Sequence, residues 1–235
     1  MAGGHALVLG GGGVAGIAWM TGLLLGLAEA GQDVGGADLV IGTSAGANVA
    51  AQLGSGRPLE ELYARQVDPA RQSRELMAVI ESRLPSREWP VTPTKLTAVD
   101  CVSGELVVFD ASSGVSLVEA VASSSAVPGI WPPVTIGGRR YMDGGVRSSD
   151  NADLAAGFAR ITVISPLGLE SPLPTPLPLR DVLASLKDGG ATVTLLSPDA
   201  ASVAAIGTNA LDPATRLPAA TAGRAQGRAG LPPAF

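Results

Sequence analysis

The sequence contains very few of the side chains that most metal, redox and nucleic-acid sites require. Histidine and cysteine each occur once, at His5 and Cys101, so an internal disulfide and an ordinary His/Cys metal site are both excluded. No DxDxDG calcium loop is present. The net charge is -5 and the basic residues form no cluster, which argues against nucleic acid and against electrostatic attraction to an anionic membrane. We therefore expect no metal, no cofactor and no nucleic-acid partner.

Aromatic residues are also scarce, at 3%, and the N-terminus lacks the basic segment of a signal peptide. The apolar residues 14–30 are interrupted by glycines and end in a charge, so they do not predict a membrane span. We expect a cytoplasmic protein with at most transient contact to a membrane surface. With 46% hydrophobic residues and 31 glycines, residues 1–235 can form one closely packed domain.

Short apolar runs alternate with helical patterns in the first part of the chain. Residues 6–9 lead through four glycines into a helical pattern over 14–30, and residues 38–41 lead into a second one over about 45–53. Alternating units of this kind predict a parallel sheet covered by helices. We therefore predict an α/β fold, as a three-layer α/β/α sandwich with a mainly parallel central sheet.

Turn signals and periodicity predict the later elements. The expected elements are hairpins over 95–110 and around 137–138, helices over 117–124, 179–187 and 199–206, and a strand over 192–196.

Three further segments are assigned from composition and spacing. Apolar residues at helical spacing over 57–83 indicate two amphipathic helices. They would form a lid-like segment over 57–90, although packing against the core is the simpler interpretation. The Pro-rich residues 166–178 predict a loop, and residues 213–235 predict a solvated terminal helix or tail.

Residues 42–46, with the sequence GTSAG, have the G-x-S-x-G form of a nucleophile elbow at a predicted strand-to-helix junction. Gly42 and Gly46 permit the sharp turn that would expose the Ser44 hydroxyl. The N-terminus of the next helix would favour negative charge beside it. Taken alone, the pentapeptide fits a tight turn with a helix-capping serine equally well.

Gly11, Gly12, Gly13 and Gly16 follow a predicted strand and precede a predicted helix, so their unobstructed amides form an anion cradle. In an acyl hydrolase this cradle would be the oxyanion hole. The same glycines fit the dinucleotide fingerprint, which leaves a Rossmann-type nicotinamide or flavin protein as an alternative. That fingerprint expects an acidic residue at the end of the second strand, where this chain has residues 42–46 instead.

A serine nucleophile needs a general base, and the usual one is histidine. His5 begins the first predicted strand, roughly 15 Å from the edge where the glycine turns leave the sheet, so it is excluded. A carboxylate must then serve. The candidates are Asp100, Asp110, Asp143, Asp150 and Asp153.

Asp143 is the best of these candidates because Gly144 and Gly145 follow it directly, after a short predicted strand. Two glycines let the backbone bring the carboxylate against another loop. The other four lie in ordinary turn or helix-cap settings, and a simple Asp-Gly turn is the alternative for Asp143 itself. Burial would raise the pKa of Asp143 and nearby amides would lower it, so the direction stays open. We expect activity to hold a plateau through neutral pH.

Four motifs in this order and spacing resemble those of the patatin-like phospholipases. They are the GGGxxG loop, the GTSAG elbow, ASSSAVP at 122–128 and DGG at 143–145. The resemblance covers about residues 7–149. It implies an α/β sandwich, lipid acyl-ester substrates, a Ser44/Asp143 dyad and an oxyanion hole at residues 11–13. Many members have Arg or Lys before the last glycine of the first loop, where this chain has Ala15, and its short length implies that a large cap domain is absent.

The sequence thus predicts a serine acyl hydrolase of the lipid esterase or phospholipase A type, which works through an acyl-enzyme. The acyl chain is expected between residues 76–84 and the loop that carries Trp131. The second hypothesis is a non-catalytic lipid- or acyl-binding member of the same fold.

Overall fold

The computed structural model of the protein describes residues 3–32, 34–68, 80, 84–170 and 175–233. Within them, eight strands form one sheet in the order β5-β6-β3-β2-β1-β7-β8, and β4 pairs with β3. The strands are β1 (His5–Leu9), β2 (Leu39–Gly42), β3 (Thr94–Asp100), β4 (Leu106–Phe109), β5 (Val134–Ile136), β6 (Arg139–Asp143), β7 (Arg160–Ile164) and β8 (Thr192–Leu196).

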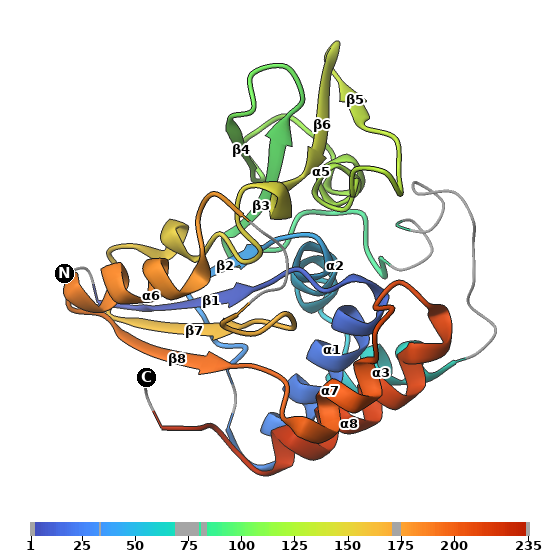
Figure 1. Ribbon diagram of the computed structural model, residues 1–235, viewed down its shortest axis with the longest axis vertical. Helices are drawn as coiled ribbons and strands as arrows, with labels where there is room; N and C mark the ends of the chain where they lie inside the picture. The colour runs from blue at the N-terminus through green and yellow to red at the C-terminus, as the bar shows by residue number, and fades with distance from the viewer. Residues whose placement is uncertain (1–2, 33, 69–79, 81–83, 171–174, 234–235) are drawn as a thin grey trace.

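Helices cover both faces of this sheet (Figure 1). One face carries α6 (Leu179–Asp188) and the short 3-10 segment η2 (Ala152–Ala155). The other face carries α1 (Gly13–Glu29), α2 (Ala45–Leu53) and, outside α1, α8 (Arg216–Arg228). The other helices of the described residues are α3 (Leu59–Val67), α5 (Leu117–Ser124) and α7 (Ala200–Ile206). The other 3-10 segments there are η1 (Gly144–Val146) and η3 (Pro213–Thr215).

Strands β3, β2, β1, β7 and β8 run parallel, whereas β4, β5 and β6 are antiparallel additions. Every residue of β1 and β2 is buried, as expected for parallel strands covered on both faces. Helix α1 is apolar all round and buried along most of its length. The predicted α/β sandwich with a mainly parallel central sheet is confirmed.

The pairing of β3 explains how the DGG segment reaches the elbow. Leu96 pairs with both Gly42 of β2 and Phe109 of β4, while Ala98 pairs with both Asp143 of β6 and Val107 of β4. A strand has only two edges, and β4 occupies one of them beside both residues. Strands β2 and β6 therefore follow each other along the other edge. The end of β6 is thus brought beside the end of β2.

The predicted terminal helix is present as α8, but one of its faces is packed closely against α1 and is not solvated. Gly223 and Gly227 of α8 are buried. A Cβ atom would come within 2.2 Å of the Trp19 carbonyl oxygen at Gly223 and within 2.2 Å of the Leu23 carbonyl oxygen at Gly227. The small residues of the tail therefore form a contact face for α1 rather than a solvent-exposed surface.

We expect Gly223→Ala to lower the free energy of unfolding by about 1–3 kcal/mol, because the added methyl group would force the two helix backbones apart. Urea unfolding followed by circular dichroism measures the change. Gly36→Ala is the matched control, since a Cβ at Gly36 meets no atom within 4 Å. Equal effects of the two substitutions would contradict the close helix contact.

The other predicted helices and strands agree with the structure in part. The hairpins and helix α5 lie where they are predicted, but β7 is not predicted by the sequence reading. Helix α3 packs against α1 and α8 with Leu62 buried, which fits core packing. The second predicted helix before residue 84, including Leu76, falls largely outside the described residues. No helix among the described residues is long and apolar enough to cross a bilayer.

Candidate active site

Ser44 lies at the turn between β2 and α2 in an unusual backbone conformation. Its φ is 54° and its ψ is -112°, a region that residues other than glycine rarely occupy. The flanking glycines make room for this turn: a Cβ at Gly46 would lie 1.9 Å from the Leu9 carbonyl oxygen, and one at Gly42 would lie 2.7 Å from the Ala47 Cα. The elbow is therefore a strained turn that only glycine-flanked sequences permit.

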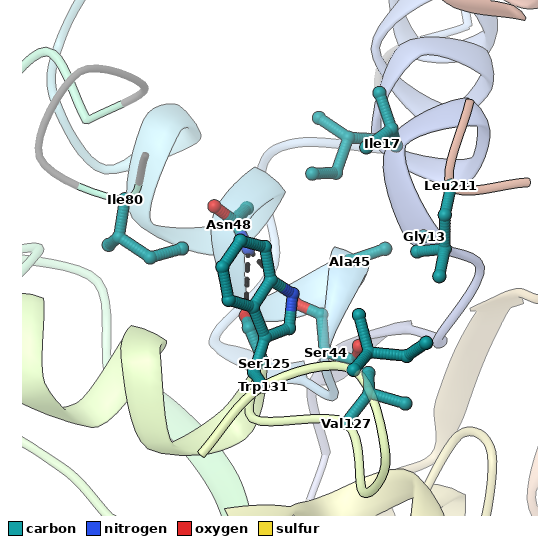
Figure 2. A pocket seen from close by; sticks show the side chains of 12 residues that line it. Gly13, Ile17, Ser44, Ala45, Asn48, Ile80, Ser125, Val127, Trp131 and Leu211 are labelled. Atoms are coloured by element: carbon teal, nitrogen blue, oxygen red, sulfur yellow. Dashed lines mark hydrogen bonds between the residues drawn. The ribbon is translucent and has the colours of Figure 1, made fainter. Parts of the chain in front are cut away.

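Side chains from α5 and α2 hold the elbow in place. The Ser44 amide donates to Ser124 Oγ at 2.9 Å. The Asn48 side-chain amide donates to the Ser44 carbonyl at 3.2 Å and to Ser125 Oγ at 3.1 Å (Figure 2). These contacts give ASSSAVP a structural role, since its serines anchor the strained turn to the end of α5.

Asp143, the last residue of β6, is 4% exposed and lines one pocket together with Ser44. Its Oδ1 accepts a hydrogen bond from the Gly145 amide at 2.7 Å. Oδ2 is buried and has no hydrogen-bond partner among the described residues. Burial raises the pKa of Asp143 to about 6, and the nearby Ser44 hydroxyl and the Gly145 amide offset part of that effect. The Ser44 hydroxyl is thus close enough to interact, although it makes no hydrogen bond of ordinary geometry with Asp143.

Asn151 connects the elbow to the DGG segment, and it is not among the site residues that the sequence predicts. It is fully buried in a left-handed conformation, with φ 48°. Its amide nitrogen lies 3.1 Å from Thr43 Oγ1, 3.3 Å from Thr97 Oγ1 and 3.2 Å from the Gly144 carbonyl oxygen. One side chain therefore touches the residue before Ser44, strand β3 and the residue after Asp143. An asparagine shortly after DGG is too common a turn signal to identify this role from sequence.

The glycine loop offers fewer free donors than the sequence predicts. The Gly11 amide already donates to the Ser149 carbonyl at 2.8 Å. The amides of Gly12 and Gly13, and that of Ala45 after the elbow serine, donate to no acceptor in the described part of the chain. Gly13 takes a φ of 62°, which aids the turn into α1. Among the described residues, the amides of Gly12, Gly13 and Ala45 are therefore available as donors, whereas that of Gly11 is engaged.

The other candidate bases lie elsewhere. Asp100 accepts from the Val102 and Ser103 amides and pairs with Arg139 at 2.9 Å, and these bonds lower its pKa. Asp110 accepts hydrogen bonds from Ser112 and Ser113, and Asp153 forms an ion pair with Arg147.

His5 lies at the opposite end of β1 from the glycine loop, as predicted, and its Nε2 contacts Thr162 Oγ1 at 2.9 Å. Burial lowers its pKa. His5 is therefore not placed to act on Ser44.

Asp150 is not in the ordinary turn that the sequence predicts for it. Its side chain is fully buried, and neither carboxyl oxygen makes a hydrogen bond of ordinary geometry in the described structure. It packs behind the glycine loop, where a Cβ at Gly10 would lie 2.0 Å from Oδ1. Burial raises its pKa to about 7, only partly offset by the Ser165 hydroxyl. Asp150 thus lies at Gly10 and Ser165, which directly follow β1 and β7, and it lines neither pocket at Ser44.

Two pockets meet at Ser44. The larger, of about 530 Å³, is lined by Ser44, residues 11–13 and Asp143, with apolar walls from Val146, Leu167 and neighbouring residues. The smaller, of about 180 Å³, extends to Ile80 and Trp131 without touching Asp143 (Figure 2). Val127 and Leu211 line both pockets at the serine. The two pockets therefore share Ser44 as a common lining residue.

Among solved structures, this chain resembles VipD from Legionella pneumophila, with a TM-score of 0.50 and 12% identity over 96% of this chain and 65% of that one. It also resembles the type III effector protein ExoU, with a TM-score of 0.44 and 16% identity over 96% of this chain and 52% of that one. The chain thus spans less than two thirds of either protein. At such identities, the likeness to VipD shows the fold alone. No curated protein sequence matches this chain.

A family model described as patatin-like phospholipase matches residues 7–76 and 81–156, which is more than half of the chain. The match includes the glycine loop, the elbow and the DGG segment. The chain therefore belongs to the patatin-like phospholipase family.

Proposed function

We propose that the protein is a serine acyl hydrolase in which Ser44 is the nucleophile and Asp143 the general base. The observation that carries this proposal is the buried Asp143 Oδ2, which has no hydrogen-bond partner of ordinary geometry among the described residues and shares a pocket with Ser44, whose hydroxyl lies close enough to interact with Asp143. Buried polar atoms are normally paired, so an orphaned one beside a strained serine points to a role in catalysis. Membership of the family supports a lipid substrate.

In the proposed mechanism, Asp143 takes the proton from the Ser44 hydroxyl as the oxygen attacks an ester carbonyl. The amides of Gly12, Gly13 and Ala45 hold the oxyanion, each donor contributing about 3 kcal/mol to stabilisation of the transition state. Asp143 then gives its proton to the leaving alcohol, which leaves an acyl-enzyme. Water activated by the same carboxylate releases the acid. With a pKa of about 6, Asp143 is mostly ionised at neutral pH and can begin this cycle.

Two alternatives have less support. A non-catalytic lipid-binding member would not need an unpaired carboxylate buried beside a serine, since burying such a group costs stability. A dinucleotide protein would need an acidic residue at the end of β2, where the elbow lies, and a free Gly11 amide, which is already engaged.

An active-site fluorophosphonate tests the proposal directly, because only an activated serine beside an oxyanion hole reacts quickly. We expect one label per chain at Ser44, found by mass spectrometry, and hydrolysis of a short acyl ester by the same preparation. Ser44→Ala should remove both signals. Ser185→Ala, at an exposed serine of α6 that lines neither pocket at Ser44, is the control for the substitution itself. Labelling that persists undiminished in Ser44→Ala would refute the assignment, and a wild-type protein that neither labels nor hydrolyses would favour the binding alternative.

A further inference from the structure

The position of Asp143 relative to the two pockets assigns the halves of the substrate, and this step rests on the proposed function. In a dyad mechanism the group that deprotonates the serine must later protonate the leaving alcohol, so the alcohol oxygen has to lie within its reach. Asp143 lines the larger pocket and is absent from the walls of the smaller one. The alcohol therefore belongs in the larger pocket, and the acyl chain in the smaller one.

The smaller pocket fits a short acyl chain. Its described walls are largely aliphatic and aromatic, with Ile17, Ile80, Ile130 and Trp131 facing the cavity. Its volume is about 180 Å³. An apolar cavity of about 150 Å³ holds one benzene molecule, so this pocket accommodates an acyl group of about six carbons. The sequence-based placement of the acyl chain beside Trp131 agrees with this assignment.

The described residues that line the larger pocket offer no cation to a phosphate. None of these lining residues is Lys or Arg, and the basic residue adjacent to them in the sequence is Arg147, between Val146 and Ser149. Arg147 is held by Asp153 through contacts of 2.8 and 3.0 Å and by Asn151 Oδ1 at 2.7 Å. Asp143 is the charged group among the described lining residues, and its carboxylate would repel an anion.

We propose that the protein hydrolyses esters of an uncharged, largely apolar alcohol, such as acylglycerols, in preference to phosphate-bearing glycerolipids. The apolar wall of Val127, Pro128, Val146, Leu167 and Leu211 favours burial of such an alcohol. A phosphate in the same place would lose water without gaining a cation or a free guanidinium. The preference is set by the pocket that takes the leaving group, and the acyl chain does not contribute to it.

The test compares dihexanoylglycerol with dihexanoyl phosphatidic acid, both below their micellar concentrations, so that the acyl chains are identical and only the phosphate differs. Acid release gives kcat/KM for each. We expect the value to be at least about tenfold higher for the neutral ester. Val146, 40% exposed at the pocket wall, is the place to add a cation. Val146→Lys should raise the phosphatidic acid to diacylglycerol ratio several-fold more than the matched Val146→Gln, which removes the same apolar side chain without adding a charge.

Equal or faster cleavage of phosphatidic acid by the wild type would overturn this inference while leaving the proposed hydrolase intact. A ratio that rises equally in both Val146 variants, or in neither, would also overturn it, because the alcohol would then not lie in the larger pocket. Absence of acid release from both esters, together with absence of fluorophosphonate labelling at Ser44, would instead contradict the proposed function and this inference with it.

Discussion

Asp143→Asn is expected to lower kcat for a short acyl ester by at least about a hundredfold, the low end of what a general base contributes. The amide keeps the shape of the carboxyl group and its contact with the Gly145 amide, but it cannot accept the serine proton. A stopped assay with purified variant and wild type measures the loss. Circular dichroism and the urea unfolding midpoint show whether the fold is preserved.

The pH dependence separates a catalytic from a merely structural Asp143. Activity requires the ionised carboxylate, and its pKa is raised to about 6, so kcat/KM should be constant above about pH 7 and fall as the pH drops through 6. The residual activity of Asp143→Asn should not show this fall at acidic pH. A structural role would reduce activity but leave the shape of the profile unchanged.

Two control variants complete the experiment. His5→Ala should keep near wild-type kcat and the same fall at acidic pH, since His5 lies at the far end of β1 and contacts Thr162. Asp100→Asn should keep near wild-type kcat because its carboxylate pairs with Arg139 outside both pockets at Ser44. If Asp143→Asn retained most of its turnover while Asp100→Asn lost it, the general base would not be Asp143.

The raised pKa of Asp143 places a fall in activity near pH 6, where the sequence alone predicts none. From the sequence, burial and hydrogen bonding act on Asp143 in opposite directions with unknown weights. In the structure, burial raises the pKa of Asp143 more than the Ser44 hydroxyl and the Gly145 amide lower it. A fall near pH 6 therefore does not by itself distinguish this carboxylate from a histidine. The variants above are needed for that distinction.

The local parts of the site could be predicted because the chemistry lies in consecutive residues. The elbow at Ser44 follows from glycines that a strand-to-helix turn requires, and the hairpins follow from Ser103-Gly104 and Gly137-Gly138. The parallel sheet follows from the repeated strand, glycine turn and helix unit.

Features that depend on contacts between distant segments could not be predicted. Whether the Gly11 amide is free depends on Ser149, which lies far along the chain. Whether Asn151 touches Thr43 depends on β2 and β6 sharing one edge of β3. Strand β7 is different, because its residues 161–164 are all β-branched, which is typical of a strand and could have predicted it from the sequence.

Asp150 is the residue for which sequence and structure differ most, and its burial should make stability strongly dependent on pH. An aspartate in the unfolded chain titrates near 3.9, whereas burial holds the Asp150 pKa at about 7 in the folded protein. Between these two values the unfolded state has released the proton and the folded state retains it. The folded state thus binds more protons, so its stability falls as the pH rises from about 4 to 7 and is level above.

The size of that effect is about 4 kcal/mol over the full interval, at about 1.4 kcal/mol for each pH unit. We expect Asp150→Asn to abolish it, because the amide resembles the protonated acid and does not ionise. The measurement is the difference in unfolding free energy between variant and wild type, taken from urea curves at several values from pH 4 to 8. The unfolding free energy of the variant should rise relative to that of the wild type by about 4 kcal/mol between pH 4 and 7.

The change in that difference with pH is independent of any constant cost of placing an amide behind Gly10, so a poorly packed variant still gives a decisive result. Asp188→Asn, at an exposed position at the end of α6, controls for the substitution itself. Asp143→Asn should show the same trend with a smaller size, since its folded pKa is about 6. A difference for Asp150→Asn that stays constant from pH 4 to 8 would mean that this carboxyl group has a partner or water in solution, and that the space behind the glycine loop is not dry.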